Sequence, residues 1–356
     1  MIYIVDLESV STRYTGQWKE HVPALLQRQG HTVTVIDGPM DIPAATTPGA
    51  FLNFGGTNIY KSAQVEKISR LFCNGQIKPG DYFLFTDAWH PGIINLKYMS
   101  ELLNIPIKIG GLWHAGSYDS ADFLGRVIGN EPWVRHAEKA FFHAIDHNFF
   151  ATNFHIDMFI DRLLGMDTDL GRMHYMPTNK IVRSGWPMEY LSETLMTYKN
   201  MPKRDLIVFP HRIAPEKQVE IFRDLANEMP EYEFVVCQDQ SLTKDEYHTL
   251  LGQAKMVFSA NLQETLGISC FEGALVCAIP FVPDRLSYRE MYLDEFKYPG
   301  EWTADWTSYK QNRAQLIDRM RNQLRRYDDL APLVEQNADT LRQDFFSADG
   351  ICQVVR

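Results

Sequence analysis

The sequence contains no hydrophobic run that reaches the roughly 18 residues a membrane-spanning helix needs. Its first ten residues, MIYIVDLESV, also lack the basic stretch of a secretion signal and carry Asp6 and Glu8 instead. We therefore expect a cytoplasmic protein without a membrane span. Its first residues, Met1 to Asp6, are predicted to form a buried strand.

Cysteine and positive charge are both scarce. The five cysteines follow no paired spacing, which argues against a disulfide framework and favours small core residues. Lysine and arginine number 35 against 45 aspartates and glutamates, so the net charge is −10. This balance argues against a protein whose main task is to coat nucleic acid. A local basic strip remains conceivable at Arg313 to Arg326, although a solvated helix face explains that segment better.

Core-forming residues are abundant. Hydrophobic residues make up 45% of the chain and charged residues 22%, which is typical of a globular protein. A length of 356 residues is enough for two domains. Because short apolar runs alternate with helical segments, we expect parallel sheets with right-handed crossovers. The predicted fold class is α/β, with two Rossmann-like, doubly wound domains.

The apolar runs place the predicted strands as follows. In the first half they are Met1–Asp6, Thr32–Ile36, Ala50–Phe54, Asp81–Thr86, Ile105–Gly110, Phe149–Thr152 and Lys180–Arg183. In the second half they are Asp205–Phe209, Glu233–Cys237, Lys255–Ser259 and Ala278–Val282. The predicted helices include Gln17–Gln29, Gln64–Phe72, Leu96–Leu103, Gln218–Glu228, Thr243–Leu251, Ile268–Val276, Tyr309–Tyr327 and Asp329–Phe346. Gly16 ends a polar loop before the first helix.

Histidine and aspartate gather in the loops of the first half, and a metal site there is one interpretation. The candidate ligands are Asp87, His90, His114 and Asp119, and a second group of His143, Asp146, His147 and His155. No pair has a compact ligand spacing, and the HExxH signature fails because Ala144 stands where glutamate is needed. We expect no metal and no cofactor.

The stretch from Asn261 to Pro280 predicts a strand, a loop, a small apolar helix and a second strand. Units of this kind hold ligands at the carboxyl end of the first strand, and the free amides of the helix N-terminus bind anions. Glu264 and Glu272 are separated by seven residues in this unit. Amides for phosphate and carboxylates for hydroxyl groups suit a nucleotide sugar. Two unrelated glutamates on a solvated helix are the alternative, but the helix is too apolar for a surface position.

This stretch resembles the E-x7-E motif of retaining GT-B glycosyltransferases, in particular glycosyltransferase family four. The matching residues are Glu264-Thr265-Leu266-Gly267-Ile268, Glu272-Gly273-Ala274 and Ile279-Pro280. The departures, Leu266 for the usual Phe, Gly273 for Ala and Ala278 for Gly, remove no polar group. Arg212 and Lys217 likewise resemble the family's Arg-x4-Lys element. Two fixed cations suit a diphosphate leaving group, whose charge grows as the bond breaks.

The resemblance implies a role for each matching residue. Glu272 would hold ribose hydroxyls, Glu264 would meet the sugar, and Arg212 with Lys217 would bind the diphosphate, aided by Leu266, Gly267 and Ile268. His114 would contact the sugar from the first domain. The family often has a glycine pair in its first loop, where this chain has only Gly16, so a phosphate contact from Gly16 is the weakest of these implications.

The resemblance also implies a GT-B organisation, with two domains facing a central cleft. We predict an acceptor-side domain over residues 1–190, a nucleotide-sugar domain over 203–335, and a C-terminal helix over 336–356 that returns to the first domain. The polar run Tyr198–Lys203 reads as the linker.

We accordingly expect a retaining, metal-independent glycosyltransferase, with UDP-glucose as the first donor to test. Phage enzymes that glucosylate DNA share this fold and size, so a 5-hydroxymethylated pyrimidine in DNA is a plausible acceptor, on which Trp89, Trp113, Tyr118 or Trp133 could stack. Glycan, lipid and small-metabolite acceptors stay open. So do a nucleotide-sugar epimerase of the same fold and a binding protein without turnover.

Overall fold

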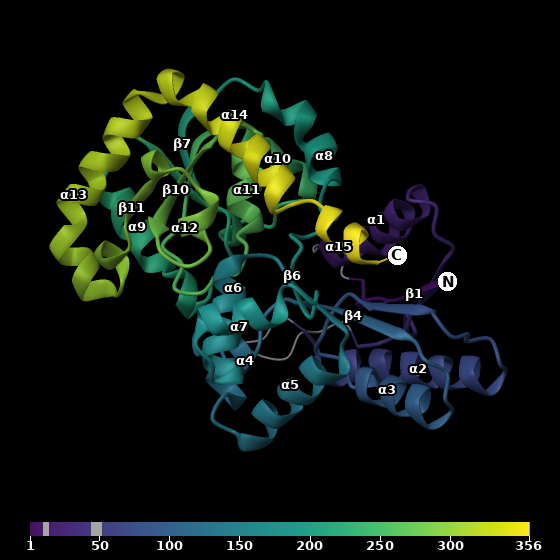
Figure 1. The fold of residues 1–356 in the computed structure, drawn as a ribbon. Helices are drawn as coiled ribbons and strands as arrows, with labels where there is room; N and C mark the ends of the chain where they lie inside the picture. The colour runs from purple at the N-terminus through teal and green to yellow at the C-terminus, as the bar shows by residue number, and fades with distance from the viewer. Residues whose placement is uncertain (10–13, 44–51, 356) are drawn as a thin grey trace. The chain divides into compact units, whose positions relative to one another are not determined.

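The computed structural model describes residues 1–9, 14–43 and 52–355, and the chain divides into two compact units (Figure 1). The first unit contains Met1–Pro187 together with the residues from Ala348 onward, and the second contains Met188–Ser347. The run predicted as a linker, Tyr198–Lys203, thus lies inside the second unit. Of the segment 336–356, only the part from Ala348 onward groups with the first unit.

The first unit is built on a parallel six-stranded sheet in the order β2-β1-β3-β4-β5-β6. The strands are β1 (Ile2–Val5), β2 (Val33–Ile36), β3 (Tyr82–Phe85), β4 (Lys108–Trp113), β5 (His147–Phe150) and β6 (Ile181–Arg183). All residues of β1 and β3 are buried, as expected of parallel strands covered on both faces. β1 and β3 end level with each other, because Val5 pairs with Phe85.

Helices connect these strands and cover the sheet. They are α1 (Tyr14–Arg28), α2 (Phe54–Cys73), α3 (Gly92–Leu102), α4 (Phe123–Ile128), α5 (Pro132–Ala144), α6 (Asn153–Met158), the π-helical η1 (Phe159–Leu164), α7 (Thr168–Tyr175) and α15 (Asp349–Val354). The contacts of α3 with α2 and α5 place these three helices on one face of the sheet (Figure 1). The core of this unit is rich in aromatic residues, among them Phe83, Phe85, Trp113, Phe142 and Phe150.

Several sequence predictions in this unit were wrong in detail, among them the strand Phe149–Thr152, which is observed as β5 two residues earlier at each end. The predicted strand Ala50–Phe54 lies partly outside the described residues, and its last residue instead begins α2, because the Asn53 side chain caps that helix by accepting a hydrogen bond from the amide of Gly56. Gly16 lies in the first turn of α1 and not in a loop, since α1 buries Thr15, Trp18, Val22 and Leu26 at helical spacing. β4 lies three residues later than predicted at each end.

The second unit contains a parallel five-stranded sheet in the order β11-β10-β9-β7-β8. The strands are β7 (Arg204–Phe209), β8 (Glu233–Val236), β9 (Ala254–Phe258), β10 (Ile279–Asp284) and β11 (Lys297–Pro299). The α-helices are α8 (Tyr190–Lys199), α9 (Val219–Glu228), α10 (Lys244–Gln253), α11 (Ile268–Leu275), α12 (Tyr288–Met291), α13 (Trp306–Arg325) and α14 (Tyr327–Asp344). Short 3-10 turns are η2 (Pro215–Lys217), η3 (Cys237–Asp239), η4 (Asp294–Phe296) and η5 (Gly300–Thr303). α11 contacts α8 and α14 and is therefore an internal helix of this unit.

Three of the four arginines of α13, Arg313, Arg319 and Arg321, are engaged within the second unit. Arg313 forms ion pairs with Asp224 and Glu228, and Arg321 pairs with Glu231. Paired guanidinium groups attract phosphate weakly, so this segment does not form the local basic strip that the sequence left open. Over the described residues, no helix combines the length and the apolar character that crossing a membrane requires.

Candidate functional site

The most charged part of the candidate site lies in the second unit, where Lys217 and Glu264 form a buried ion pair. The Lys217 Nζ atom lies 3.2 Å from a carboxylate oxygen of Glu264 and donates a hydrogen bond of 2.6 Å to the Gln263 carbonyl. Burial raises the pKa of Glu264, but the charge of Lys217 outweighs this and holds the pKa below its ordinary value. Glu264 is thus ionised at neutral pH and is held in one position.

The loop that carries Glu264 follows β9, and the long polar side chains of Gln218 and Arg285 fix its first residues by hydrogen bonds. Gln218, in the left-handed conformation with φ of 52°, donates hydrogen bonds to the carbonyls of Ala260 and Thr303. Arg285 donates to the carbonyls of Ala260 and Asn261. These hydrogen bonds satisfy the carbonyls of Ala260 and Asn261 from inside the domain and so fix the start of the loop that carries Glu264.

Gly267 brings the chain from this loop into α11. Its φ of +78° is left-handed, and a Cβ atom there would lie 2.7 Å from the Tyr288 ring. Glycine is therefore required on both conformational and steric grounds. α11 begins at the next residue, Ile268, so the first amides of the helix follow directly after Glu264 and the buried Leu266. Free amides in this position favour an anion.

Glu272 lies in the second turn of α11, within the same strand–loop–helix unit as Glu264. Tyr247 donates a hydrogen bond of 2.8 Å to one of its carboxylate oxygens. Burial raises the pKa of Glu272 to about 7, against the opposing effect of that hydrogen bond. Glu264 and Glu272 therefore differ in their partners and in the direction of their pKa shifts. Glu264 pairs with the charged Lys217, and its pKa is lowered, whereas Glu272 pairs with the neutral Tyr247 hydroxyl, and its pKa is raised.

Arg212 lies on the connection from β7 to α9, five residues before Lys217. It forms an ion pair with the buried carboxylate of Glu216. About a third of the Arg212 side chain, 34%, is exposed, against 7% for Lys217. The structure therefore offers one buried cation beside Glu264 and one more accessible cation on the same connection.

Sequence reasoning missed His211, the neighbour of Arg212. Its ring is buried, its Nδ1 atom lies 3.2 Å from the Ser269 hydroxyl in the first turn of α11, and burial lowers its pKa to about 3. Its Nε2 atom is buried and has no hydrogen-bond partner in the part of the chain that the structure describes. Its position directly after β7 was the available signal, since loops at the ends of parallel strands form sites.

His114 lies in the first unit, directly after β4. Its Nε2 atom is 2.6 Å from the Thr86 carbonyl, and its Nδ1 atom is 2.7 Å from the Tyr14 hydroxyl. Because a carbonyl only accepts, Nε2 carries the proton and Nδ1 accepts from Tyr14. Burial lowers the pKa of His114, so the ring is neutral. The structure therefore holds His114 in one tautomer and one orientation.

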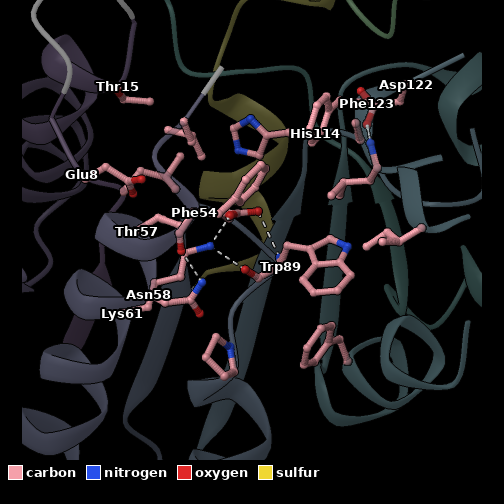
Figure 2. Close-up of a pocket in the computed structure, with 18 of the residues that line it drawn as sticks. Glu8, Thr15, Phe54, Thr57, Asn58, Lys61, Trp89, His114, Asp122 and Phe123 are labelled. Carbon is pink, nitrogen blue, oxygen red and sulfur yellow. Dashed lines mark hydrogen bonds and ion pairs between the residues drawn. The ribbon is translucent and has the colours of Figure 1, made fainter. Parts of the chain in front are cut away.

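A pocket of about 590 Å³ lies in the first unit next to His114 (Figure 2). Its walls come from the ends of β1, β3 and β4 and from α2, α4 and α5, which is where open parallel sheets hold ligands. Lys61 forms an ion pair of 2.8 Å with Asp87 on its wall and also donates to the Trp89 carbonyl (dashed lines in Figure 2). The pocket and Lys61 were not predicted, and Asp87 was considered from the sequence only as a possible metal ligand.

The aromatic residues that sequence analysis proposed for stacking divide into two groups. Trp89 and Trp133 line the pocket. Trp113 and Tyr118 are core residues, each 1% exposed, and hydrogen-bond to Asn148 and His155. Only the first two are therefore in a position to meet a ligand in this unit.

Four of the five histidines considered as metal ligands, His90, His114, His147 and His155, contact other polar protein groups. The His90 ring contacts the Gln64 side chain and the Gly92 amide, His147 contacts Tyr82, and the two ring nitrogens of His114 are engaged as described. Over residues 1–9, 14–43 and 52–355, no three His, Cys, Asp or Glu side chains come together as a possible metal site.

No protein-family model and no curated protein sequence matches the chain. Solved structures do match it. The α,α-trehalose-phosphate synthase (UDP-forming) from Burkholderia vietnamiensis has a TM-score of 0.60 at 12% identity, covering 100% of this chain and 99% of that one. Sucrose-phosphate synthase from Thermosynechococcus elongatus has a TM-score of 0.57 at 11% identity, with coverages of 99% and 96%.

The catalytic domain of starch synthase IV from Arabidopsis thaliana, bound to ADP and acarbose, has a TM-score of 0.56 at 12% identity and covers 98% of each chain. At such low identity a likeness establishes the fold, and its near-complete coverage includes both parallel-sheet units. The prediction of an α/β fold with two Rossmann-like domains is therefore confirmed: this chain has the fold of the GT-B glycosyltransferases.

Proposed function

We propose that this protein is a retaining glycosyltransferase that uses a nucleoside diphosphate sugar. The observation that carries the proposal is the arrangement at β9 and α11. A buried Lys217–Glu264 pair precedes the left-handed Gly267, and Glu272 follows on the helix that starts there. The Lys217 cation comes from the connection between β7 and α9, whereas the free amides and the two carboxylates belong to the short unit of β9 and α11. Together they suit a ligand that carries both phosphate and hydroxyl groups.

Each group then has a chemical task. Lys217 and Arg212 balance the charge that develops on the diphosphate, together with the first amides of α11 at Ile268. Glu272 accepts hydrogen bonds from ribose hydroxyls, and Glu264 accepts from the sugar. Two solved structures of this fold are a starch synthase bound to ADP and a UDP-forming trehalose-phosphate synthase, which supports a nucleotide donor. UDP-glucose is the first donor to test.

The proposed reaction needs no dedicated base. The acceptor oxygen forms a bond to the anomeric carbon on the face from which the phosphate oxygen departs. The bond between the anomeric carbon and that oxygen breaks, and the departing oxygen takes the acceptor's proton. The products are the glycoside and a nucleoside diphosphate, and the anomeric configuration is kept. We propose that His114, held neutral by Tyr14 and Thr86, contacts the sugar.

Two acceptor classes follow from the sequence and the fold. One is a 5-hydroxymethylated pyrimidine in DNA, suggested by the resemblance to phage enzymes. The other is a small hydroxylated molecule. The ion pairs of α13 remove the basic strip that a duplex would need in the second unit, whereas the pocket of the first unit has the size of a small-molecule site.

Calorimetry with UDP-glucose, ADP-glucose and other donors tests the donor site directly. A donor that binds wild type should bind Glu272→Ala roughly ten- to a hundredfold more weakly, because a charged hydrogen bond to ribose is worth about 1.5–3 kcal/mol. Glu290→Ala, on α12, is the matched control. Equal affinity of Glu272→Ala and wild type would refute the site, and conversion of the donor without an acceptor would identify an epimerase instead.

Transfer is measured with labelled donor, a panel of small acceptors, and hydroxymethylated and unmodified DNA. The configuration of the purified product, determined by NMR, tests retention. An inverted product would overturn the retaining assignment while leaving the donor site intact.

A further inference from the structure

The pocket of the first unit contains two buried polar atoms without partners. The second carboxylate oxygen of Glu8 and the hydroxyl of Thr57 are both buried, and neither has a hydrogen-bond partner among the residues that the structure describes. Glu8 and Thr57 are 6% and 5% exposed, and both line the pocket (Figure 2). Buried polar atoms are nearly always paired, so two orphaned atoms on one pocket wall indicate that a ligand supplies the missing group.

The charges on the pocket wall exclude one class of ligand. Lys61 is its only positive side chain among the described residues, and it is neutralised by Asp87 and the Trp89 carbonyl. Burial raises the pKa of Asp87, but Lys61 outweighs this and holds that pKa below its ordinary value. Two further carboxylates, Glu8 and Asp122, line the same pocket. An anionic ligand would meet net negative charge, which disfavours phosphate, sulfate or carboxylate groups.

The rest of the wall is apolar and partly flat. Phe54 of α2 and Phe123 of α4 are stacked with their ring centroids 5.5 Å apart. Leu124, Val127 and Trp133 extend this apolar surface. A pocket of this kind favours a ligand with a planar or apolar body, which removes these side chains from water when it binds.

We propose that this pocket binds the acceptor of the reaction, and that the acceptor is a compact, uncharged or cationic molecule with an apolar, ring-containing body and a hydroxyl group. The hydroxyl donates to the unpartnered oxygen of Glu8 and accepts from the Thr57 hydroxyl. The identification as acceptor rests on the proposed function, whereas the ligand chemistry rests on the pocket alone. Glu8 and Thr57 come from the segment after β1 and from α2, so both elements position one hydroxyl group.

Binding without any donor tests the ligand chemistry separately from the reaction. The probes are 2-naphthol, 2-methoxynaphthalene, which cannot donate, and 2-naphthoate, which is an anion. Calorimetry or tryptophan fluorescence should rank 2-naphthol first, with each of the other two about tenfold weaker or more. Equal affinity for naphthoate and naphthol would overturn the proposal, as would no binding of any probe.

Variants identify the two anchoring groups. Glu8→Gln and Thr57→Val keep the shape of the wall but remove one acceptor and one donor, and each should weaken 2-naphthol binding about tenfold. Glu8→Gln should leave 2-methoxynaphthalene unchanged, because this probe donates no hydrogen bond, whereas Thr57→Val should weaken both probes, because the ether oxygen also accepts from Thr57. Glu66→Gln, an exposed position on α2, is the matched control. Unchanged naphthol affinity in both pocket variants, with circular dichroism showing a native fold, would overturn the assignment.

A transfer experiment separates this proposal from the proposed function. If naphthol binds as predicted but no donor gives transfer to any acceptor, the site stands and the glycosyltransferase assignment fails. If sugar is transferred to hydroxymethylated duplex DNA with Glu8→Gln as active as wild type, the function stands and the small-acceptor assignment fails.

Discussion

Glu272 shows how one residue can serve binding at the expense of stability. Burial raises its pKa to about 7, so folding favours the protonated form. A carboxyl group with a raised pKa contributes stability that is fully present below its unfolded pKa and is lost as pH rises through the folded pKa. The pH window in question therefore runs from the ordinary glutamate value of 4.5 to about 7.

Glu272→Gln should consequently be more stable than wild type at pH 8, by roughly 3 kcal/mol, with the difference disappearing below pH 4.5. Urea unfolding at pH 4.5, 6 and 8 measures this. The donor affinity of wild type should fall as pH drops below about 7, because the protonated carboxyl loses acceptor capacity, and the Gln variant should show a flat profile. A stability difference that does not change with pH would contradict the raised pKa.

Removing the charge of Lys217 should strongly lower the free energy of unfolding of the second unit. Lys217→Met leaves the Glu264 carboxylate without its cation, and breaking a buried ion pair in this way costs about 3–5 kcal/mol. The double variant Lys217→Met/Glu264→Gln removes both charges and should recover most of that loss. Both variants should lose transfer activity.

Chemical denaturation of the single and double variants measures the coupling between the two residues. If Lys217→Met were within about 1 kcal/mol of wild type, the pair would not be buried in the way the structure describes.

At the scale of elements, the joint between the β9 loop and α11 depends on Gly267. Gly267→Ala combines left-handed backbone strain, about 1–3 kcal/mol, with a steric conflict against the Tyr288 ring. Gly30→Ala is a matched control, because Gly30 has φ of +89° but a Cβ atom added there would meet nothing within 4 Å. We expect Gly267→Ala to be the less stable of the two by about 1–3 kcal/mol and to bind donor more weakly.

Thermal unfolding of the two alanine variants checks this prediction. Equal destabilisation would mean that strain alone matters and that Tyr288 moves freely, in which case it would not define the entry into α11.

The elements of the second unit were predicted more accurately than those of the first, for a physical reason. The helix expected to begin at Ile268 begins there, and β7 and β8 differ from the predictions by one residue at one end, because their buried runs are short and bounded by polar residues. In the first unit the described part of the strand predicted to end at Phe54 is not a strand, since Asn53 supplies a helix cap and Phe54 begins α2.

The candidate site of the second unit could likewise be predicted from the sequence better than the pocket of the first unit. The motif residues around Glu264 are close in sequence and could be recognised there. The pocket could not, because Glu8 and Thr57 come from separate segments of the chain, and their two atoms that lack a partner among the described residues are brought to one pocket only by folding. His114 was identified as a candidate from the sequence. Its hydrogen bonds with Tyr14 and Thr86 could not be predicted, because residue spacing in the sequence does not show which distant residues pack together.

At the scale of the whole molecule, the first unit is completed by α15. Ile351 and Val355 are buried, and Gly350 approaches Ser184 so closely that a Cβ atom would lie 2.5 Å from its Cα atom. Ile351→Ala should destabilise the first unit by about 2–5 kcal/mol, as large-to-small core substitutions do. Gln353→Ala, at an exposed position of the same helix, should have little effect.

Hydrogen exchange shows which unit is affected. In Ile351→Ala the amides of β5 and β6 should exchange faster, while those of β7 and β9 remain protected as in wild type. Faster exchange in β7 and β9 alone would place the helix in the other folding unit.

The grouping of α15 with the first unit also has a consequence for biosynthesis. A ribosome makes residues 1–187 first, yet the helix that covers this unit near Ser184 is translated only after the whole of Met188–Ser347. During synthesis the first domain therefore lacks α15, and the surface that α15 buries stays exposed until the second domain has been translated. Premature termination just before α15 would leave two nearly finished domains with an unsealed apolar surface, a natural substrate for chaperones and proteases.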